Sequence, residues 1–250
     1  MFMERIIFQQ PGKIVFGEGS FDQFVQDLKV SGLKRLFVLA VPFLKNEIEN
    51  KFKVLNENGI TYLINSELNS EPAFSHFYQF MDEAIAFNPD GMIGIGGGSI
   101  LDVAKLLAAM IGNDQKIDDV VGIGLLKKRD LFLACLPTTS GTGSEVSPNA
   151  ILLDEADGMK KGIISPYLVP DASYIDPLLT VGMPPEISAS TGMDALTHCL
   201  EAYTNRFSHP MVDLYALEGI RLISKNLLKV CRNGSDIQAR TQLSLGSLYG

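Results

Sequence analysis

Short apolar runs alternate with amphipathic stretches between residues 33 and 111, and no other feature of the sequence limits the fold as much. The apolar runs are LKRLFVLA at 33–40, ITYLI at 60–64 and GMIGI at 91–95, and the amphipathic stretches cover 43–58, 72–87 and 99–111. Such runs predict buried strands joined by helices, as in the βαβ units of a parallel sheet. Further buried strands are expected at 131–137, 149–154 and 172–176.

The pattern changes near Pro184-Pro185. Beyond this point apolar residues recur at spacings of three and four, which predicts helices. The segments with this spacing are 185–204, 210–230 and 236–250. We therefore expect an α/β domain at 1–185 and an all-helical domain that starts at 186 and continues to 250.

Composition excludes several classes of protein. With 250 residues, 46% of them hydrophobic, the chain can bury a core, which excludes a disordered protein. It has 29 acidic against 21 basic residues, and its longest basic run is Lys127-Lys128-Arg129, so nothing forms the positive surface that nucleic acids require.

The sequence also predicts a protein that is neither secreted nor embedded in a membrane. Residues 1–19 contain no apolar core of signal-peptide length, and eighteen apolar residues never run together. The cysteines, Cys135, Cys199 and Cys231, are odd in number and lie in apolar sequence, which favours buried thiols over disulfides. A cytoplasmic location is expected.

A glycine-rich turn joins the strand expected at 91–95 to the helix expected at 99–111. Gly97, Gly98 and Ser99 would bring backbone N–H groups and the positive end of a helix close to a phosphate. The pattern is neither a Walker A motif nor the usual G-x-G-x-x-G. The alternative interpretation is an ordinary turn capped by Ser99, with Asp102 and Lys105 forming a solvated ion pair.

A second polar loop, LPTTSGTGSEVSPNA at 136–150, follows a buried strand. It presents hydroxyl groups around two glycines, including those of Thr138, Thr139, Thr142 and Ser144. Hydroxyl groups at a strand end suit the sugar and phosphate oxygens of a nucleotide, because open α/β sheets bind ligands there. A Ser/Thr-rich turn without a ligand is the alternative.

In GMDALTHCLEAY, at 192–203, Asp194 and His198 stand four residues apart in a predicted helix. Side chains at i and i+4 project from one face, so a carboxylate oxygen and an imidazole nitrogen could bind the same ion. Taken alone, the spacing favours a structural ion pair.

Taken together, GGGSILDVAK, PTTSGTGSEVS, SPYLVPDASYIDP and GMDALTHCLEAY, in this order, resemble the iron-containing (group III) alcohol dehydrogenase family from residue 13 onward. The resemblance implies an α/β dinucleotide-binding domain with a parallel sheet, followed by an all-helical domain that is incomplete in this chain. It also implies a homodimer that acts on small alcohols, aldehydes or ketones.

The resemblance assigns roles to residues by motif. Gly97, Gly98 and Ser99 would hold the cofactor pyrophosphate, and Asp102 would lie near the nicotinamide. The residues along the adenine and ribose would be Thr138, Thr139, Thr142 and Ser144, with Lys160 facing the cofactor and Leu179 contacting adenine. Asp194 and His198 match the first two metal ligands, so catalysis would depend on them through a divalent metal, with Fe²⁺ preferred over Zn²⁺.

Two departures from the family pattern leave alternatives open. The family has two further metal histidines in later helices, whereas this chain has three histidines in all, and neither His76 nor His209 matches a ligand. The chain is therefore expected to be a fragment of a longer enzyme or, less favoured, a natural truncation. Val41 stands where an acidic residue would exclude a 2′-phosphate, so both NAD and NADP are open.

Three functions follow from this pattern. The first is a metal-dependent NAD(P) oxidoreductase of the iron-type alcohol dehydrogenase class, although the activity of the 250-residue chain itself is uncertain. The second is an inactive nucleotide-binding chain. The third is an NAD-dependent lyase similar to dehydroquinate synthase, which would recycle its bound cofactor.

Overall fold

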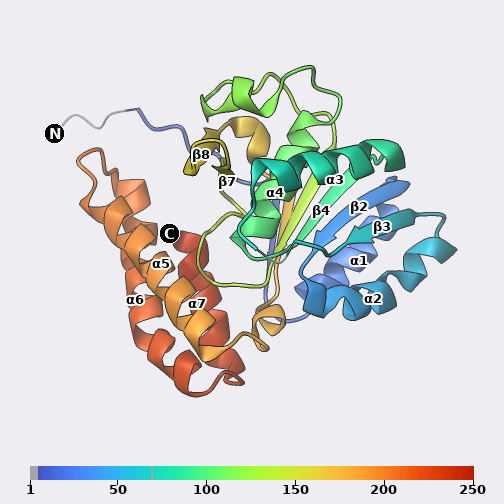
Figure 1. Ribbon diagram of the computed structural model, residues 1–250. Coiled ribbons are helices and arrows are strands. Elements are labelled where there is room, and N and C mark those ends of the chain that lie inside the picture. Colours follow the sequence, from blue (N-terminus) through green and yellow to red (C-terminus); the bar gives the residue numbers. More distant parts are fainter. Residues whose placement is uncertain (1–4, 69) are drawn as a thin grey trace. The chain divides into compact units, whose positions relative to one another are not determined.

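A computed structural model describes residues 5–68 and 70–250 of the chain. Contacts divide these residues into two compact units (Figure 1). The α/β unit contains Gln10–Pro137 and Ser144–Ile175. The helical unit contains Asp176–Gly250 together with Thr138–Gly143 and residues 5–9. An α/β fold followed by helices is thus confirmed.

The α/β unit is built on a six-stranded sheet whose strand pairs are all parallel. Its strands, in sheet order, are β1 (Lys13–Phe16), β9 (Ala172–Ile175), β6 (Phe132–Pro137), β4 (Gly91–Gly96), β2 (Arg35–Ala40) and β3 (Thr61–Asn65). The order reverses direction between β2 and β4. Open α/β sheets bind ligands at such a reversal, beyond the carboxyl ends of the strands.

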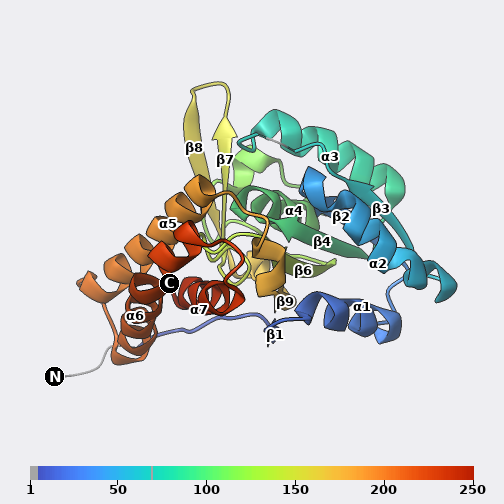
Figure 2. The same cartoon turned by 90° about the horizontal axis from the view of Figure 1, so that it is seen from below.

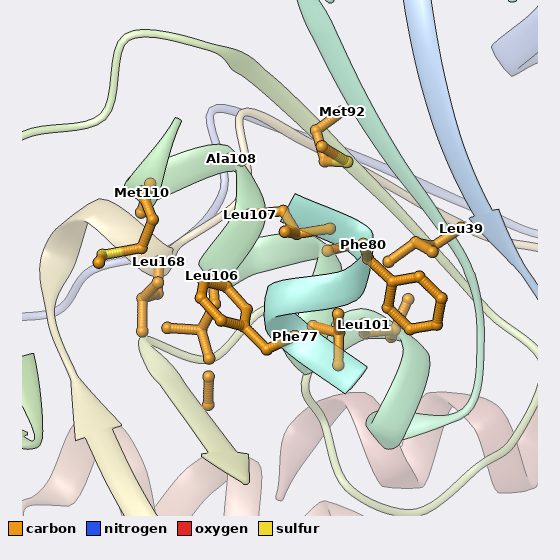
Figure 3. Close-up of a cluster of buried hydrophobic side chains, with 14 of the residues drawn as sticks. Leu39, Phe77, Phe80, Met92, Leu101, Leu106, Leu107, Ala108, Met110 and Leu168 are labelled. Carbon is orange, nitrogen blue, oxygen red and sulfur yellow. The ribbon is translucent and has the colours of Figure 1, made fainter. Parts of the chain in front are cut away.

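Four helices cover the two faces of this sheet. They are α1 (Ser20–Val30), α2 (Lys45–Glu57), α3 (Phe74–Phe87) and α4 (Gly98–Met110). In Figure 1, α3 and α4 lie on one face, and α1 and α2 lie on the other. Phe77 and Phe80 of α3 pack with Leu101 of α4 and Met92 of β4 in a buried cluster (Figure 3). This packing fixes the start of α4, which follows the glycine turn.

A second, three-stranded sheet has the order β5 (Gly122–Ile123), β8 (Met159–Ile164) and β7 (Asn149–Asp154). The expectation that 149–154 forms a buried strand needs correction, because β7 pairs antiparallel with β8 and its side chains alternate between buried and exposed. Short 3-10 helices complete the chain. They are η1 (Pro42–Leu44), η2 (Ile117–Val120), η3 (Pro166–Leu168) and η4 (Pro177–Thr180).

The helical unit consists of α5 (Pro185–Thr204), α6 (Pro210–Arg232) and α7 (Ile237–Tyr249), which pack against one another (Figure 2). Their shared core includes Ala195, Cys199, Ile223 and Leu243. Prolines begin α5 and α6 because the first helical position needs no backbone N–H. Over residues 5–68 and 70–250, no helix is long and apolar enough to cross a membrane.

The two units interleave along the sequence, which differs from a single boundary at 185. The helical unit begins at Asp176 and also takes in Thr138–Gly143 from the middle of the hydroxyl-rich loop. Periodicity detects the start of α5 at Pro185. Periodicity does not reveal that Thr138–Gly143 pack with helices that lie almost fifty residues later in the sequence.

Replacing Gly96 by alanine is expected to cost about 2 kcal/mol of stability, a typical cost of overpacking. Gly96 ends β4, and an added Cβ would lie 2.6 Å from Cβ of Ile100 in α4. Urea unfolding measures the loss. Gly162→Ala is the control, because a Cβ at this strand glycine meets nothing within 4 Å. Equal stability of the two variants would show that α4 does not pack this closely on β4.

Candidate functional site

The glycine turn leaves the start of α4 open to a ligand. Gly97 is the N-cap, with extended backbone at φ −75° and ψ 179°, and no described side chain caps the helix. The interpretation of Ser99 as the cap is therefore wrong, since Ser99 is an exposed residue in the first turn of α4. Uncapped N–H groups and the positive helix end suit a phosphate group.

This turn lies at the point where the strand order reverses. The N–H of Val41, the residue after β2, donates to the carbonyl oxygen of Ile95 in β4 at 3.0 Å. On the other side, Pro137 at the end of β6 is in register with Gly96. The glycine turn, Val41 and Pro137 at the start of the hydroxyl-rich loop thus meet at one edge of the sheet.

Asp102 and Ser144, both predicted to contact the cofactor, contact each other. The Ser144 hydroxyl donates to Oδ1 of Asp102 at 2.5 Å, and the Ile151 N–H donates to Oδ2 at 3.0 Å. Ser144 is buried, and only 15% of the Asp102 side chain is exposed. The carboxylate therefore joins α4 to the loop and to β7.

Lys105 completes this network from within the protein. The idea of a solvated Asp102–Lys105 ion pair is wrong, because Lys105 is completely buried. Its Nζ lies 3.7 Å from Oδ1 of Asp102 and donates to the carbonyl oxygen of Ser144 at 2.9 Å. The face of α4 that carries Lys105 is covered by the loop, which the sequence pattern of the helix does not reveal.

Burial controls the ionisation of the groups around Lys105. It raises the pKa of the Asp102 carboxyl and lowers the pKa of the Lys105 ammonium, while their mutual attraction opposes both changes. Burial also raises the pKa of the Cys135 thiol to about 12, so this cysteine stays protonated and unreactive at neutral pH. The pKa of the buried Glu145 carboxyl rises to about 7 for the same reason.

The first half of the hydroxyl-rich loop packs within the helical unit. The hydroxyl groups of Ser140 and Ser244 lie 2.8 Å apart, which ties the loop to α7. An added Cβ at Gly141 would lie 2.8 Å from Cβ of Thr191 and 3.0 Å from its carbonyl oxygen. Only glycine fits this contact. It brings the loop against α5 one turn before Asp194.

The remaining predicted cofactor residues are in different surroundings. Thr138 is buried, Thr139 is partly buried and Thr142 is exposed, all three in the helical unit. Lys160 is exposed on β8 and forms an ion pair with Glu71. Leu179 in η4 is buried.

Leu178, next to Leu179, is 49% exposed, so a second leucine of this turn is open to solvent. The motif comparison selected Leu179. Leu178 becomes apparent only when the orientation of the η4 turn is known.

Asp194 and His198 face each other on α5. Oδ1 of Asp194 and Nε2 of His198 are 3.6 Å apart, and 46% and 37% of the two side chains are exposed. One carboxylate oxygen and one imidazole nitrogen at this separation fit the coordination of a divalent cation. Within the described parts of the chain, however, no group of three or more His, Cys, Asp or Glu side chains gathers at one point. The pair thus supplies two donors.

The other two histidines have structural roles. Nδ1 of His76 accepts a hydrogen bond from the N–H of Ala73 at the start of α3. Nδ1 of His209 accepts one from the N–H of Met211 at the start of α6. Both imidazoles therefore cap helices. The three cysteines are free thiols, as expected, but Cys231 is only partly buried, unlike Cys135 and Cys199.

Two comparisons relate this geometry to known proteins. A profile described as "Iron-containing alcohol dehydrogenase" matches residues 11–177, and a second, described as "Fe-containing alcohol dehydrogenase family, C-terminal", matches residues 188–250. Long-chain-alcohol dehydrogenase 1 of Geobacillus thermodenitrificans is 37% identical over 99% of this chain and 63% of its own length. Sulfoacetaldehyde reductase of Bilophila wadsworthia is 33% identical to this chain. The match covers 94% of this chain and 61% of the reductase.

Solved structures also match nearly all of this chain but only part of their own length. The NADH-dependent butanol dehydrogenase A of Thermotoga maritima superimposes with a TM-score of 0.89 at 29% identity. The match covers 98% of this chain and 63% of that protein. The chain therefore spans somewhat less than two thirds of the length of these relatives.

Proposed function

Because this chain belongs to the iron-containing alcohol dehydrogenase family, we propose that it acts in a metal-dependent NAD(P) oxidoreductase. The reaction interconverts an alcohol and an aldehyde or ketone. The observation that carries the proposal is the Asp194–His198 pair, 3.6 Å apart on α5, in a chain whose α4 also begins with an uncapped glycine turn. The relatives named as alcohol dehydrogenases and as an aldehyde reductase support the same chemistry in both directions.

The proposed cofactor is NAD or NADP. The N–H groups at Gly98 and Ser99 would bind the pyrophosphate, and the hydroxyl groups of Thr138, Thr139 and Thr142 would bind ribose and phosphate oxygens. Val41, whose N–H bonds to Ile95 just before the glycine turn, is apolar where a carboxylate would repel a 2′-phosphate. The named dependence of one relative on NADH favours NAD, and Val41 leaves NADP open. Lys160 and Leu179 keep their proposed roles at the cofactor.

Asp194 and His198 would hold a divalent cation, Fe²⁺ or Zn²⁺. When bound, the cation would supply Lewis acidity, which makes loss of the alcohol proton easier at neutral pH. In alcohol oxidation the nicotinamide, when bound, would accept a hydride from the carbinol carbon, and the hydroxyl proton would pass to solvent. The chain's own contribution is to hold the donors on one helix face and to fix the pyrophosphate. A homodimer in the cytoplasm is part of the proposal.

The test is turnover by the protein that carries this sequence, loaded with Fe²⁺ or Zn²⁺ and supplied with NAD or NADP. A panel of primary and secondary alcohols, aldehydes and keto acids should reveal activity that a chelator abolishes. Release of NADH in proportion to product distinguishes this reaction from a lyase that recycles bound NAD. Nucleotide binding without turnover or retained metal would instead support an inactive nucleotide-binding chain.

A further inference from the structure

We infer that Lys105 is a positioning residue for cofactor binding, because its buried ammonium fastens the hydroxyl-rich loop to the helix that follows the glycine turn. The inference rests on the proposed function, which makes both of these segments part of the cofactor site. The contacts from which it is argued all join residues of the α/β unit. Motif comparison assigned Lys105 no role.

Three oxygen atoms surround the Lys105 ammonium. Nζ donates to the Ser144 carbonyl oxygen at 2.9 Å, to the Ser144 hydroxyl at 3.0 Å and to the Ser147 hydroxyl at 3.3 Å. An ammonium group has three N–H donors, so this arrangement uses each of them. All three acceptors belong to residues 144–147. A completely buried lysine is uncommon, and its charge is tolerated only with such partners.

Asp102 provides a second attachment of α4 to the loop, beside that of Lys105. The Ser144 hydroxyl accepts from Lys105 and donates to Oδ1 of Asp102 at 2.5 Å, so it points into the protein. The other carboxylate oxygen accepts from the Ile151 N–H at 3.0 Å. Two side chains on successive turns of α4 thus hold the loop at Ser144 and β7 at Ile151.

The attachment has a specific consequence for the proposed site. Residues 138–143 carry the hydroxyl groups predicted to bind ribose and phosphate. Pro137, just before them, is held in register with Gly96, and Ser144, just after them, is held on α4. The two residues that flank this segment, Pro137 and Ser144, are therefore both anchored within the α/β unit. A binding loop fixed in advance loses less entropy when its ligand arrives, which strengthens binding.

Stability alone does not account for the network. Buried ion pairs seldom stabilise a fold more than apolar side chains of similar size, so a purely structural role could be filled without charge. The prediction is therefore that affinity for the cofactor and stability of the fold respond differently to substitution. Lys105→Met removes the charge and leaves Asp102 buried without a cation. Asp102→Asn/Lys105→Met removes both charges.

The experiment measures NADH binding by the fluorescence of the reduced nicotinamide. Lys105→Met should raise the Kd at least about tenfold and lower the melting temperature. The double variant should regain melting temperature but keep the weakened affinity, because 144–147 still lack their donor. Lys53→Met, at an exposed position of α2, is the matched control and should bind NADH normally.

Two results would overturn the inference. One is unchanged NADH affinity in Lys105→Met, and the other is recovery of both affinity and melting temperature in the double variant. Amide hydrogen exchange at Ser144, Ser147 and Ile151 gives a readout without cofactor, and it should accelerate in Lys105→Met. If the unsubstituted protein binds neither NADH nor NADPH, the proposed function fails. Exchange at these amides still decides whether Lys105 holds the loop.

Discussion

Replacing His198 by alanine is expected to lower kcat/KM for alcohol oxidation about 10³-fold in the metal-loaded protein that carries this sequence. In the proposed site the imidazole would be one of two donors on α5 to a divalent cation, and it lies 3.6 Å from the Asp194 carboxylate. Loss of Lewis-acid stabilisation of about 4 kcal/mol corresponds to this factor. The metal content, measured by mass spectrometry, should fall with activity. Asp194→Ala should behave similarly.

The matched control is His209→Asn. His209 lies in the same unit and caps α6 through Nδ1, and asparagine is itself a favoured N-cap. The control therefore removes an imidazole without removing a cap. Its metal content and kcat/KM should match those of the unsubstituted protein. Full activity and full metal content in His198→Ala would contradict the assignment of Asp194 and His198.

Replacing Glu145 by glutamine is expected to remove a pH dependence of about 3 kcal/mol from the free energy of unfolding. The carboxyl is buried, and its pKa rises from 4.5 to about 7. The difference corresponds to this energy at 1.36 kcal/mol per pKa unit. Burial of the carboxyl is the main cause of its raised pKa. The nearby Lys105 ammonium opposes it.

The sign follows from proton linkage. Below pH 4.5 Glu145 is protonated in both the folded and the unfolded chain, so it has no effect on their balance. Between pH 4.5 and about 7 the unfolded chain loses this proton first, so the folded state becomes progressively less stable as pH rises. Above about pH 7 the loss is complete and constant.

Urea unfolding between pH 4.5 and 8.5 measures this effect. The unsubstituted protein should lose stability across the window relative to Glu145→Gln, and the curves should differ most above pH 7. Glu57→Gln, at an exposed position of α2, is the control and should follow the unsubstituted protein. Parallel curves for Glu145→Gln and the unsubstituted protein would show that Glu145 ionises freely in the fold.

Local sequence patterns predicted the elements that carry the site. Strands and helices alternate as expected from β2 to α4, although β3 at the sheet edge is only partly buried and α4 is buried on nearly every side. The three C-terminal helices follow their apolar spacing and prolines. The i, i+4 spacing also predicted that Asp194 and His198 face each other. These features depend on residues close together in sequence, which is why periodicity is sufficient.

The interior network depends on residues far apart in sequence, so patterns could not predict it. Lys105 is buried because 144–147 fold over α4, about forty residues later. Gly141 gives no local sign that it fits against Thr191 of α5. The small sheet of β5, β8 and β7 was missed for a related reason. The β5 strand has two residues, and β8 includes Lys160, Lys161 and Gly162, which break the apolar pattern.

Deuterium transfer tests the central claim most directly. The metal-loaded protein would be incubated with NAD, and separately with NADP, together with a primary alcohol carrying deuterium at the carbinol carbon. The reduced cofactor would be analysed by mass spectrometry and NMR. Direct hydride transfer predicts one deuterium at C4 of the nicotinamide, and a chelator should prevent its appearance. Reduced cofactor without deuterium, or no reduced cofactor with any alcohol tested, would contradict the proposed oxidoreductase.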